Sequence, residues 1–196
     1  MSLLSTYSKS DNMEKKLPPA GSHVARVYQV IDLGTHESEW EGVKRDRGLV
    51  RLSFELCNEK VVFDEEKGEQ PFSVHTRNLT NSMHEKSKLR PLVEGITGAL
   101  KEEEANGFDL SSLIGLDCLV NIELNEYKGN KYANIKSTAP VPKGMEVPKL
   151  VNTPLVFDVD TYSQEDLEKL PSFLQDKVKE SKEVKEKELD IKDTPF

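Results

Sequence analysis

The sequence is poor in the residues that form disulfides and metal centres. Its 196 residues include two cysteines and four histidines. Cys57 and Cys118 each lie in a β-patterned apolar run, with no CxxC or Cys/His spacing around them. We therefore expect two reduced core residues rather than a disulfide pair or metal ligands. His75 has no other His, Cys or Asp at metal-ligand spacing, so we expect no metal and no cofactor.

Long apolar runs are also missing. No apolar stretch approaches the roughly 18 residues that a membrane helix needs. The first twenty residues carry Asp11, Asn12, Glu14 and Lys15 where a signal peptide would have its apolar segment. We expect a cytoplasmic protein with no membrane partner.

Motifs of catalysis are lacking as well. We find no phosphate-binding glycine loop, no metal-ligand cluster and no nucleophile with a partnered histidine. The acidic runs 64–66 and 102–104 are typical of solvated surfaces. We expect a protein that is not an enzyme.

Acidic charge dominates the chain, but unevenly. The formal net charge is -8, and residues 158–196 hold twelve acidic against seven basic residues. Residues 1–157 are therefore only mildly acidic. Because phosphate binding depends on Lys and Arg, any nucleic-acid site must be a local basic patch.

The apolar pattern predicts a mainly β domain between two tails. Alternation at 24–33 places Ala25, Val27, Ile31 and Leu33 on one face, with Arg26 and Tyr28 on the other and Gln29 as an exception. Residues 34–48 and 64–70 are predicted to be loops. Helical spacing at 81–100, interrupted by Pro91, predicts one amphipathic helix or two short ones. The other predicted strands are 50–57, 72–77, 120–124 and 131–137, the last two joined by a turn at 125–130.

Three strands, a helix and a hairpin form the order of the OB-fold, a five-stranded barrel with a helix between strands 3 and 4. We expect residues 1–21 to be a flexible arm and 22–157 to be this barrel, with Phe54, Phe72 and Phe108 in its core. Residues 158–196 are expected to form a short helix starting at Ser163 and split by Pro171. The acidic tail is expected to be largely disordered beyond Lys177.

Basic and aromatic residues are interleaved where an OB-fold binds oligonucleotides. Its ligand face is that of strands 2 and 3, flanked by the loops joining strands 1 and 2 and strands 4 and 5. Single strands are held by cations on phosphates and rings that stack on bases. The candidate residues in the two loops are Trp40, Lys44, Arg45, Arg47, Tyr127, Lys128 and Lys131, and those on the strands are Arg26, Tyr28, Arg51, Arg77, Tyr132 and Lys136.

The C-terminus carries the most specific motif. Acidic residues, including Asp190 and Asp193, precede a terminal Pro195-Phe196. This resembles the acidic tip of bacterial and phage single-stranded DNA-binding proteins, with Lys192 in place of an acidic residue and Thr194 in place of an aliphatic one. The resemblance implies that Asp190, Asp193, Pro195 and Phe196 recruit replication or recombination proteins. A terminal phenyl ring beside its own carboxylate suits an apolar pocket with a basic rim.

The body resembles the phage-encoded members of this family over about residues 22–145. The segments that carry the likeness are 108–115, the hairpin 127–135 and Pro140-Val141-Pro142. The resemblance implies an OB-fold without catalysis, acting on DNA in the host cytoplasm as a homodimer or cooperative assembly.

These patterns together predict a sequence-tolerant protein that coats and protects single-stranded DNA during replication, recombination or repair. The alternative is an OB-fold module that binds protein or RNA, since fold alone does not fix function.

Overall fold

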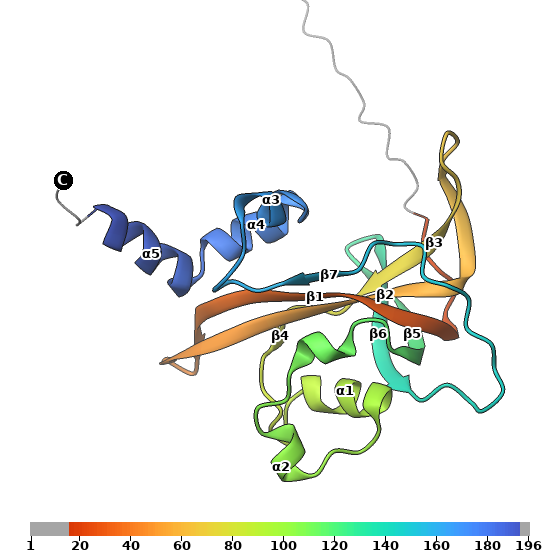
Figure 1. Cartoon of the computed structure of the whole chain (residues 1–196), viewed down its shortest axis with the longest axis horizontal. Helices are drawn as coiled ribbons and strands as arrows, with labels where there is room; N and C mark the ends of the chain where they lie inside the picture. The colour runs from red at the N-terminus through yellow and green to blue at the C-terminus, as the bar shows by residue number, and fades with distance from the viewer. Residues whose placement is uncertain (1–15, 193–196) are drawn as a thin grey trace, which may run out of the picture.

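A curled antiparallel sheet dominates the structure and forms a half-barrel (Figure 1). The computed structural model describes residues 16–192. The sheet runs in the order β3-β2-β1-β5-β6; β4 pairs with β2, and β7 pairs in parallel with β1. The strands are β1 (Gly21–Trp40), β2 (Val43–Asp64), β3 (Gly68–His75), β4 (Leu79–Thr80), β5 (Asp117–Tyr127), β6 (Asn130–Ala139) and β7 (Leu155–Phe157).

Short helices lie on both sides of this sheet, with α1 and α2 on one side and α3 to α5 on the other (Figure 1). The prediction of a mainly β domain is confirmed. A helix directly between the third and fourth strands is not confirmed, because the two-residue β4 precedes α1. The helices are α1 (Leu89–Thr97), α2 (Glu102–Ala105), the 3-10 helix η1 (Leu110–Leu113), α3 (Gln164–Glu168), α4 (Ser172–Lys179) and α5 (Lys182–Lys192).

The segment 34–48 was expected to be a loop. It is instead a two-stranded ribbon formed by the end of β1 and the beginning of β2. Its turn is confined to Glu41 and Gly42, with φ of 51° and 77°. Positive φ at both central residues is typical of the tight turn that matches strand twist. Much of the ribbon is exposed and polar, so it lacks the apolar alternation from which strands are predicted.

The turn between β5 and β6 has the same form, with Lys128 and Gly129 at φ of 51° and 77°. The predicted hairpin is therefore confirmed, although its strands extend further than expected, to Tyr127 and from Asn130.

A β-bulge at Tyr28 explains the irregular pattern of β1. Val27 pairs with Phe54 and Gln29 with Ser53, so Tyr28 is an extra residue. An extra residue exchanges the faces of the residues that follow it. Ala25 and Val27 therefore face one side of the sheet, whereas Ile31 faces the other. The expectation that Ile31 and Leu33 share a face with Ala25 and Val27 was wrong.

The main hydrophobic core lies between the sheet and α1. Leu52, Phe54 and Leu56 of β2 are fully buried there and pack with Leu89 and Val93 of α1. Burial of each large apolar side chain stabilises a fold by about 1.5–3 kcal/mol. As predicted, Phe54 and Phe72 are core residues, and the partly buried Phe108 packs against the cluster.

A second core lies on the opposite face of β1. Ile31 and Leu33 pack there against Phe157 and the helices that follow it. The start at Ser163 is confirmed by a capping box with Asp166, and Pro171 separates α3 from α4 as predicted. The expectation of disorder beyond Lys177 was wrong for the described residues, since α4 and α5 bury Val178 and Val184. The apolar residues recur every three or four positions: Leu167, Leu170, Leu174 and Val178.

Both cysteines are buried and free, as expected. Burial raises the pKa of Cys57 to about 11 and that of Cys118 to about 12. Because only the thiolate is a nucleophile, both thiols stay protonated and unreactive near neutral pH.

We predict that a thiol-specific reagent at pH 8 labels the cysteines of the folded protein slowly, and that it labels both of them rapidly once urea has unfolded the protein. Rapid labelling of the folded protein would contradict this assignment.

Gly95 allows α1 to lie directly on β6. The Thr138 hydroxyl donates to the Leu92 carbonyl at 2.7 Å, and a Cβ at Gly95 would overlap the hydroxyl and carbonyl of Thr138.

We predict that Gly95→Ala destabilises the fold by about 1–3 kcal/mol, which is the usual cost of overpacking. Urea unfolding measures this change. The matched control is Gly48→Ala, where the nearest atom would be 3.6 Å from the new Cβ. Equal effects of the two substitutions would argue against close packing of α1 on β6.

Candidate nucleic-acid interface

The outer face of the sheet, away from α1, is covered by the chain itself. Tyr28 was expected to face solvent but is only 7% exposed. Its burial raises its pKa. Arg26 is bound through Nε to Asp117 at 2.5 Å, a hydrogen bond that raises the pKa of Arg26. Arg51 lies over the Phe173 ring of α4, 5.4 Å from its centroid. The prediction that these three residues offer an open binding face is therefore wrong for this structure.

Glu55 fastens the connector 140–154 to this face. Its carboxylate is fully buried. It accepts hydrogen bonds from the Val151 amide at 2.9 Å, the Asn152 amide at 2.7 Å and Asn152 Nδ2 at 2.6 Å. The connector thus crosses the outer face over β2. Apolar alternation does not predict this contact, which joins residues nearly one hundred positions apart.

The ribbon carries the first group of predicted residues. Arg45 and Arg47 are exposed, and Lys44 is exposed but paired with Glu37 at 2.8 Å. In the ladder Arg45 lies opposite Ser38, and Trp40 lies opposite Val43. Because successive residues of a strand point to opposite faces, Arg45 and Arg47 lie on one face, and Lys44 and Asp46 lie on the other.

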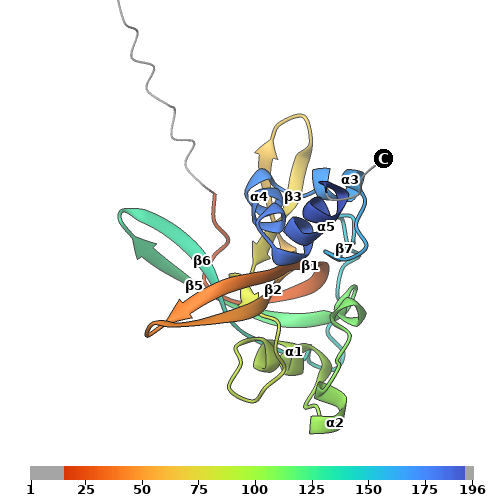
Figure 2. The same ribbon diagram turned by 90° about the vertical axis from the view of Figure 1, so that its left-hand side faces the viewer.

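The β5–β6 hairpin carries the second group. Tyr127 is 65% exposed and Tyr132 is 41% exposed. Lys128 Nζ lies 5.3 Å from the centroid of the Tyr127 ring, and Lys131 is exposed. In Figure 2 this hairpin and the ribbon both project to the left, whereas in Figure 1 the ribbon ends at the left of the molecule and β5 and β6 lie to the right of its centre. The prediction of exposed rings beside cations is confirmed for this hairpin.

A groove of about 370 Å³ lies where β3, α1 and β6 meet. We call it the basic groove. It brings together the predicted Arg77 and Lys136 with Lys88, which sequence reasoning missed. Arg77 Nη2 donates to Asn134 Oδ1 at 3.4 Å, and Lys136 pairs with Glu123. Its lining consists of His75, Thr76, Arg77, Leu79, Lys88, Pro91, Leu92, Asn125, Asn134, Ile135, Lys136 and Ser137.

The charge of this lining contrasts with that of the whole chain. Three of the twelve lining residues are Arg or Lys, and none of them is acidic. Lys88 has no side-chain ion pair or hydrogen bond within residues 16–192. In a chain of net charge -8, such a groove attracts anions.

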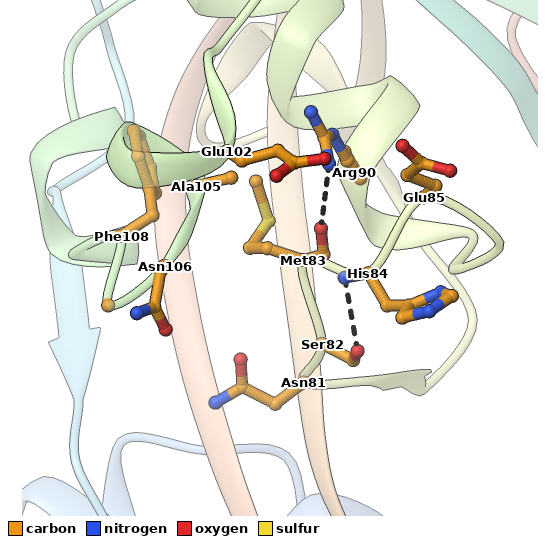
Figure 3. Close-up of a pocket in the computed structure, with 11 residues that line it drawn as sticks. Asn81, Ser82, Met83, His84, Glu85, Arg90, Glu102, Ala105, Asn106 and Phe108 are labelled. Atoms are coloured by element: carbon orange, nitrogen blue, oxygen red, sulfur yellow. Dashed lines mark hydrogen bonds between the residues drawn. The ribbon is translucent and has the colours of Figure 1, made fainter.

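A second, larger hollow of about 810 Å³ lies between the loop 81–88, α1 and α2 (Figure 3). Glu85 and Glu102 line it, so its charge is mixed. Arg90 also lines it, and its guanidinium donates to the Met83 and Leu100 carbonyls at 3.4 and 3.0 Å. We interpret this polar hollow as part of the scaffold.

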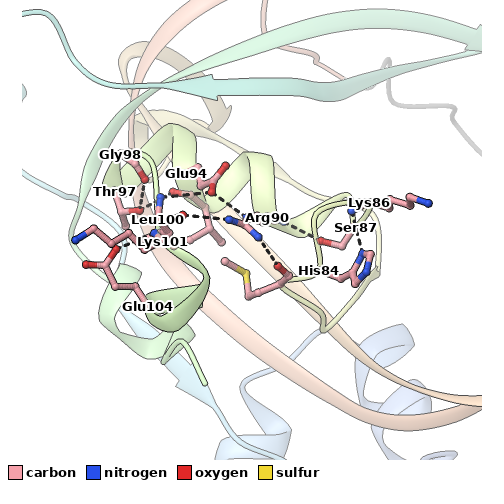
Figure 4. Close-up of polar contacts among 12 residues, drawn as sticks. His84, Lys86, Ser87, Arg90, Glu94, Thr97, Gly98, Leu100, Lys101 and Glu104 are labelled. Carbon is pink, nitrogen blue, oxygen red and sulfur yellow. Dashed lines mark hydrogen bonds and ion pairs between the residues drawn. The ribbon is translucent and has the colours of Figure 1, made fainter. Parts of the chain in front are cut away.

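Arg90 also fixes the end of α1 (Figure 4). Its Nε donates to Glu94 Oε1 at 2.9 Å, and Glu94 also accepts from the Leu100 amide at 3.4 Å. The hydrogen bond from Arg90 lowers the pKa of Glu94. Arg90 is therefore engaged in holding the 81–101 segment rather than directed at a ligand.

The predicted partner-binding tip falls largely beyond the described residues. Asp190 lies in α5, whereas Asp193, Pro195 and Phe196 lie outside residues 16–192. Within these residues, no group of His, Cys, Asp and Glu is suited to hold a metal, and no helix is long and apolar enough to cross a membrane.

The sequence matches no protein-family model and no curated protein.

The hydrogen bonds of Glu55 to the connector should contribute to the stability of the fold. Hydrogen bonds to charged groups contribute about 1.5–3 kcal/mol. We predict that Glu55→Ala lowers the free energy of unfolding by about 2 kcal/mol and speeds amide exchange at Val151 and Asn152. Urea unfolding and hydrogen exchange measure these effects. Glu69→Ala, at an exposed site, is the control, and unchanged exchange in the connector of Glu55→Ala would contradict the role of Glu55.

Proposed function

We propose that this chain is a non-catalytic, sequence-tolerant single-stranded DNA-binding protein whose half-barrel is an OB-type barrel. The path β3-β2-β1-β5-β6, with α1 between β3 and β5, supports this fold. In this interpretation β4 and β7 are additions to the five strands of the barrel.

The observation that carries the proposal is the basic groove beside the aromatic hairpin. Arg77, Lys88 and Lys136 supply positive charge for phosphates. Tyr132 lies opposite Asn125, which lines the groove, so a strand leaving the groove along β6 meets the Tyr132 ring. Cations and exposed rings in sequence are what sequence-tolerant binding of single strands requires.

The proposed surface differs from the usual ligand face of an OB-fold. That face corresponds to β2 and β3, where Ser53 and Glu55 are buried. We therefore assign binding to the groove and the β5–β6 hairpin, extended by Arg45 and Arg47 of the ribbon. In this proposal Arg26, Tyr28 and Arg51 support the fold and do not contact DNA.

The C-terminal tip, Asp190, Asp193, Pro195 and Phe196, is proposed to recruit replication, recombination or repair proteins. The likeness of this ending to the tips of single-stranded DNA-binding proteins supports that role. The likeness of the body to their phage-encoded members supports a phage protein that acts in the host cytoplasm, as a homodimer or cooperative assembly.

The salt dependence of binding tests the proposal. We predict that the full chain binds labelled oligo-dT and that its affinity falls steeply as salt rises, because bound phosphates release counterions. Replacing Arg77 and Lys88 together by Ala should weaken binding roughly tenfold and reduce the salt slope by about 0.7 for each phosphate that is no longer neutralised. Fluorescence anisotropy at several salt concentrations measures both quantities.

The matched control replaces Lys179 and Lys185 by Ala. These exposed lysines lie on α4 and α5, on the opposite side of the sheet from α1 (Figure 1). The control changes net charge equally and should leave affinity within about twofold, since only local cations contact phosphate. Equal effects of the two double variants on affinity, or no binding at low salt, would contradict the proposal. Preference for RNA or for protein partners would favour the interaction module instead.

A further inference from the structure

We infer that the basic groove receives a single nucleotide of the bound strand and discriminates modestly between bases at that position, within binding that is otherwise sequence-tolerant. This inference rests on the proposed function and deepens it. A surface that holds phosphates alone needs neither a hollow nor uncharged polar groups. The groove has both, and they lie beside its cations.

The size and floor of the groove suit one base. Its volume of about 370 Å³ falls at the lower end of the range of about 300–1,000 Å³ for small-molecule sites. Leu79 and Leu92 are almost fully buried beneath it, and Ile135 is half-buried. The exposed Pro91 adds an apolar wall. Apolar side chains of this kind contact the flat face of a base that has left its stack.

Two carboxamides provide the means of discrimination. Asn125 and Asn134 both line the groove, and each carries one acceptor oxygen and two N–H donors. Asn134 Oδ1 accepts from Arg77 at 3.4 Å, which orients Nδ2 as the remaining donor group. Hydrogen bonds of this type to the edge of a base distinguish one base from another. Because no carboxylate lines the groove, the arrangement favours an anionic nucleotide over a cationic ligand.

The cations at the rim fit the phosphates on either side of such a base. Arg77 lies just beyond β3 and Lys88 just before α1, so they approach the groove from two elements. Tyr132 lies opposite Asn125 in the β5–β6 ladder. It is placed to stack on the next base along the strand, as in other single-strand sites.

The test compares wild-type affinity for dA, dC and dT oligonucleotides of equal length at one salt concentration. We expect the affinity for the best-bound oligonucleotide to exceed the affinity for the poorest by at least fivefold. Asn134→Ala should lower the affinity for the best-bound oligonucleotide more than the affinity for the poorest, so that the preference falls to within twofold. Asn125→Ala is the second variant with the same expectation, and Asn106→Ala, exposed in the polar hollow, is the matched control. Circular dichroism verifies that each variant is folded.

Each outcome separates the two claims. Equal wild-type affinity for all three oligonucleotides, or an equal loss of affinity for all three in Asn134→Ala, would overturn base discrimination and leave DNA binding intact. No wild-type binding to any of them would overturn the proposed function itself. A preference abolished by Asn106→Ala as strongly as by Asn134→Ala would overturn the assignment to the groove.

Discussion

The β-bulge at Tyr28 allows one strand to pack against two hydrophobic clusters on opposite faces of the sheet. Before the bulge, Ala25 and Val27 face α1; after it, Ile31 and Leu33 face the C-terminal helices. Without the extra residue, Ile31 would lie in the main core and the helices would have no apolar strand to cover. The packing of the C-terminal helices on the sheet therefore depends on this insertion.

The segments that cover the outer face of the sheet limit the surface that is open to a ligand. The connector is held over β2 by Glu55, and α4 places Phe173 against Arg51. The surface on which OB-folds usually hold oligonucleotides is thus closed by the chain itself. What remains open is the basic groove with the β5–β6 hairpin and the ribbon. The groove contains no acidic residue, and the excess negative charge of the chain lies elsewhere, which is the basis of the proposal that an acidic protein binds a polyanion there.

Sequence patterns predicted the local features and missed the long-range ones. The strands of the main core, the β5–β6 turn and the start of α3 at Ser163 follow from apolar alternation and capping residues. The ribbon was missed because its exposed strands carry no apolar alternation. The ordered helix α5 was missed because the residues beyond Lys177 are mostly Lys and Glu, although Ile31 and Leu33 supply the other half of the core that Val184 joins. Lys88 joined Arg77 and Lys136 only through tertiary structure, since these residues come from three separate segments of the chain.

Hydrogen exchange of the full chain with and without saturating oligo-dT tests whether DNA binds the basic groove rather than the outer face of the sheet. We predict new protection at residues 75–91 and 127–137, with exchange at Val151 and Asn152 unchanged because the connector stays bound to Glu55. New protection at residues 51–57 together with faster exchange at residues 148–157 would contradict it. That result would mean that DNA displaces the connector and binds the outer face of the sheet.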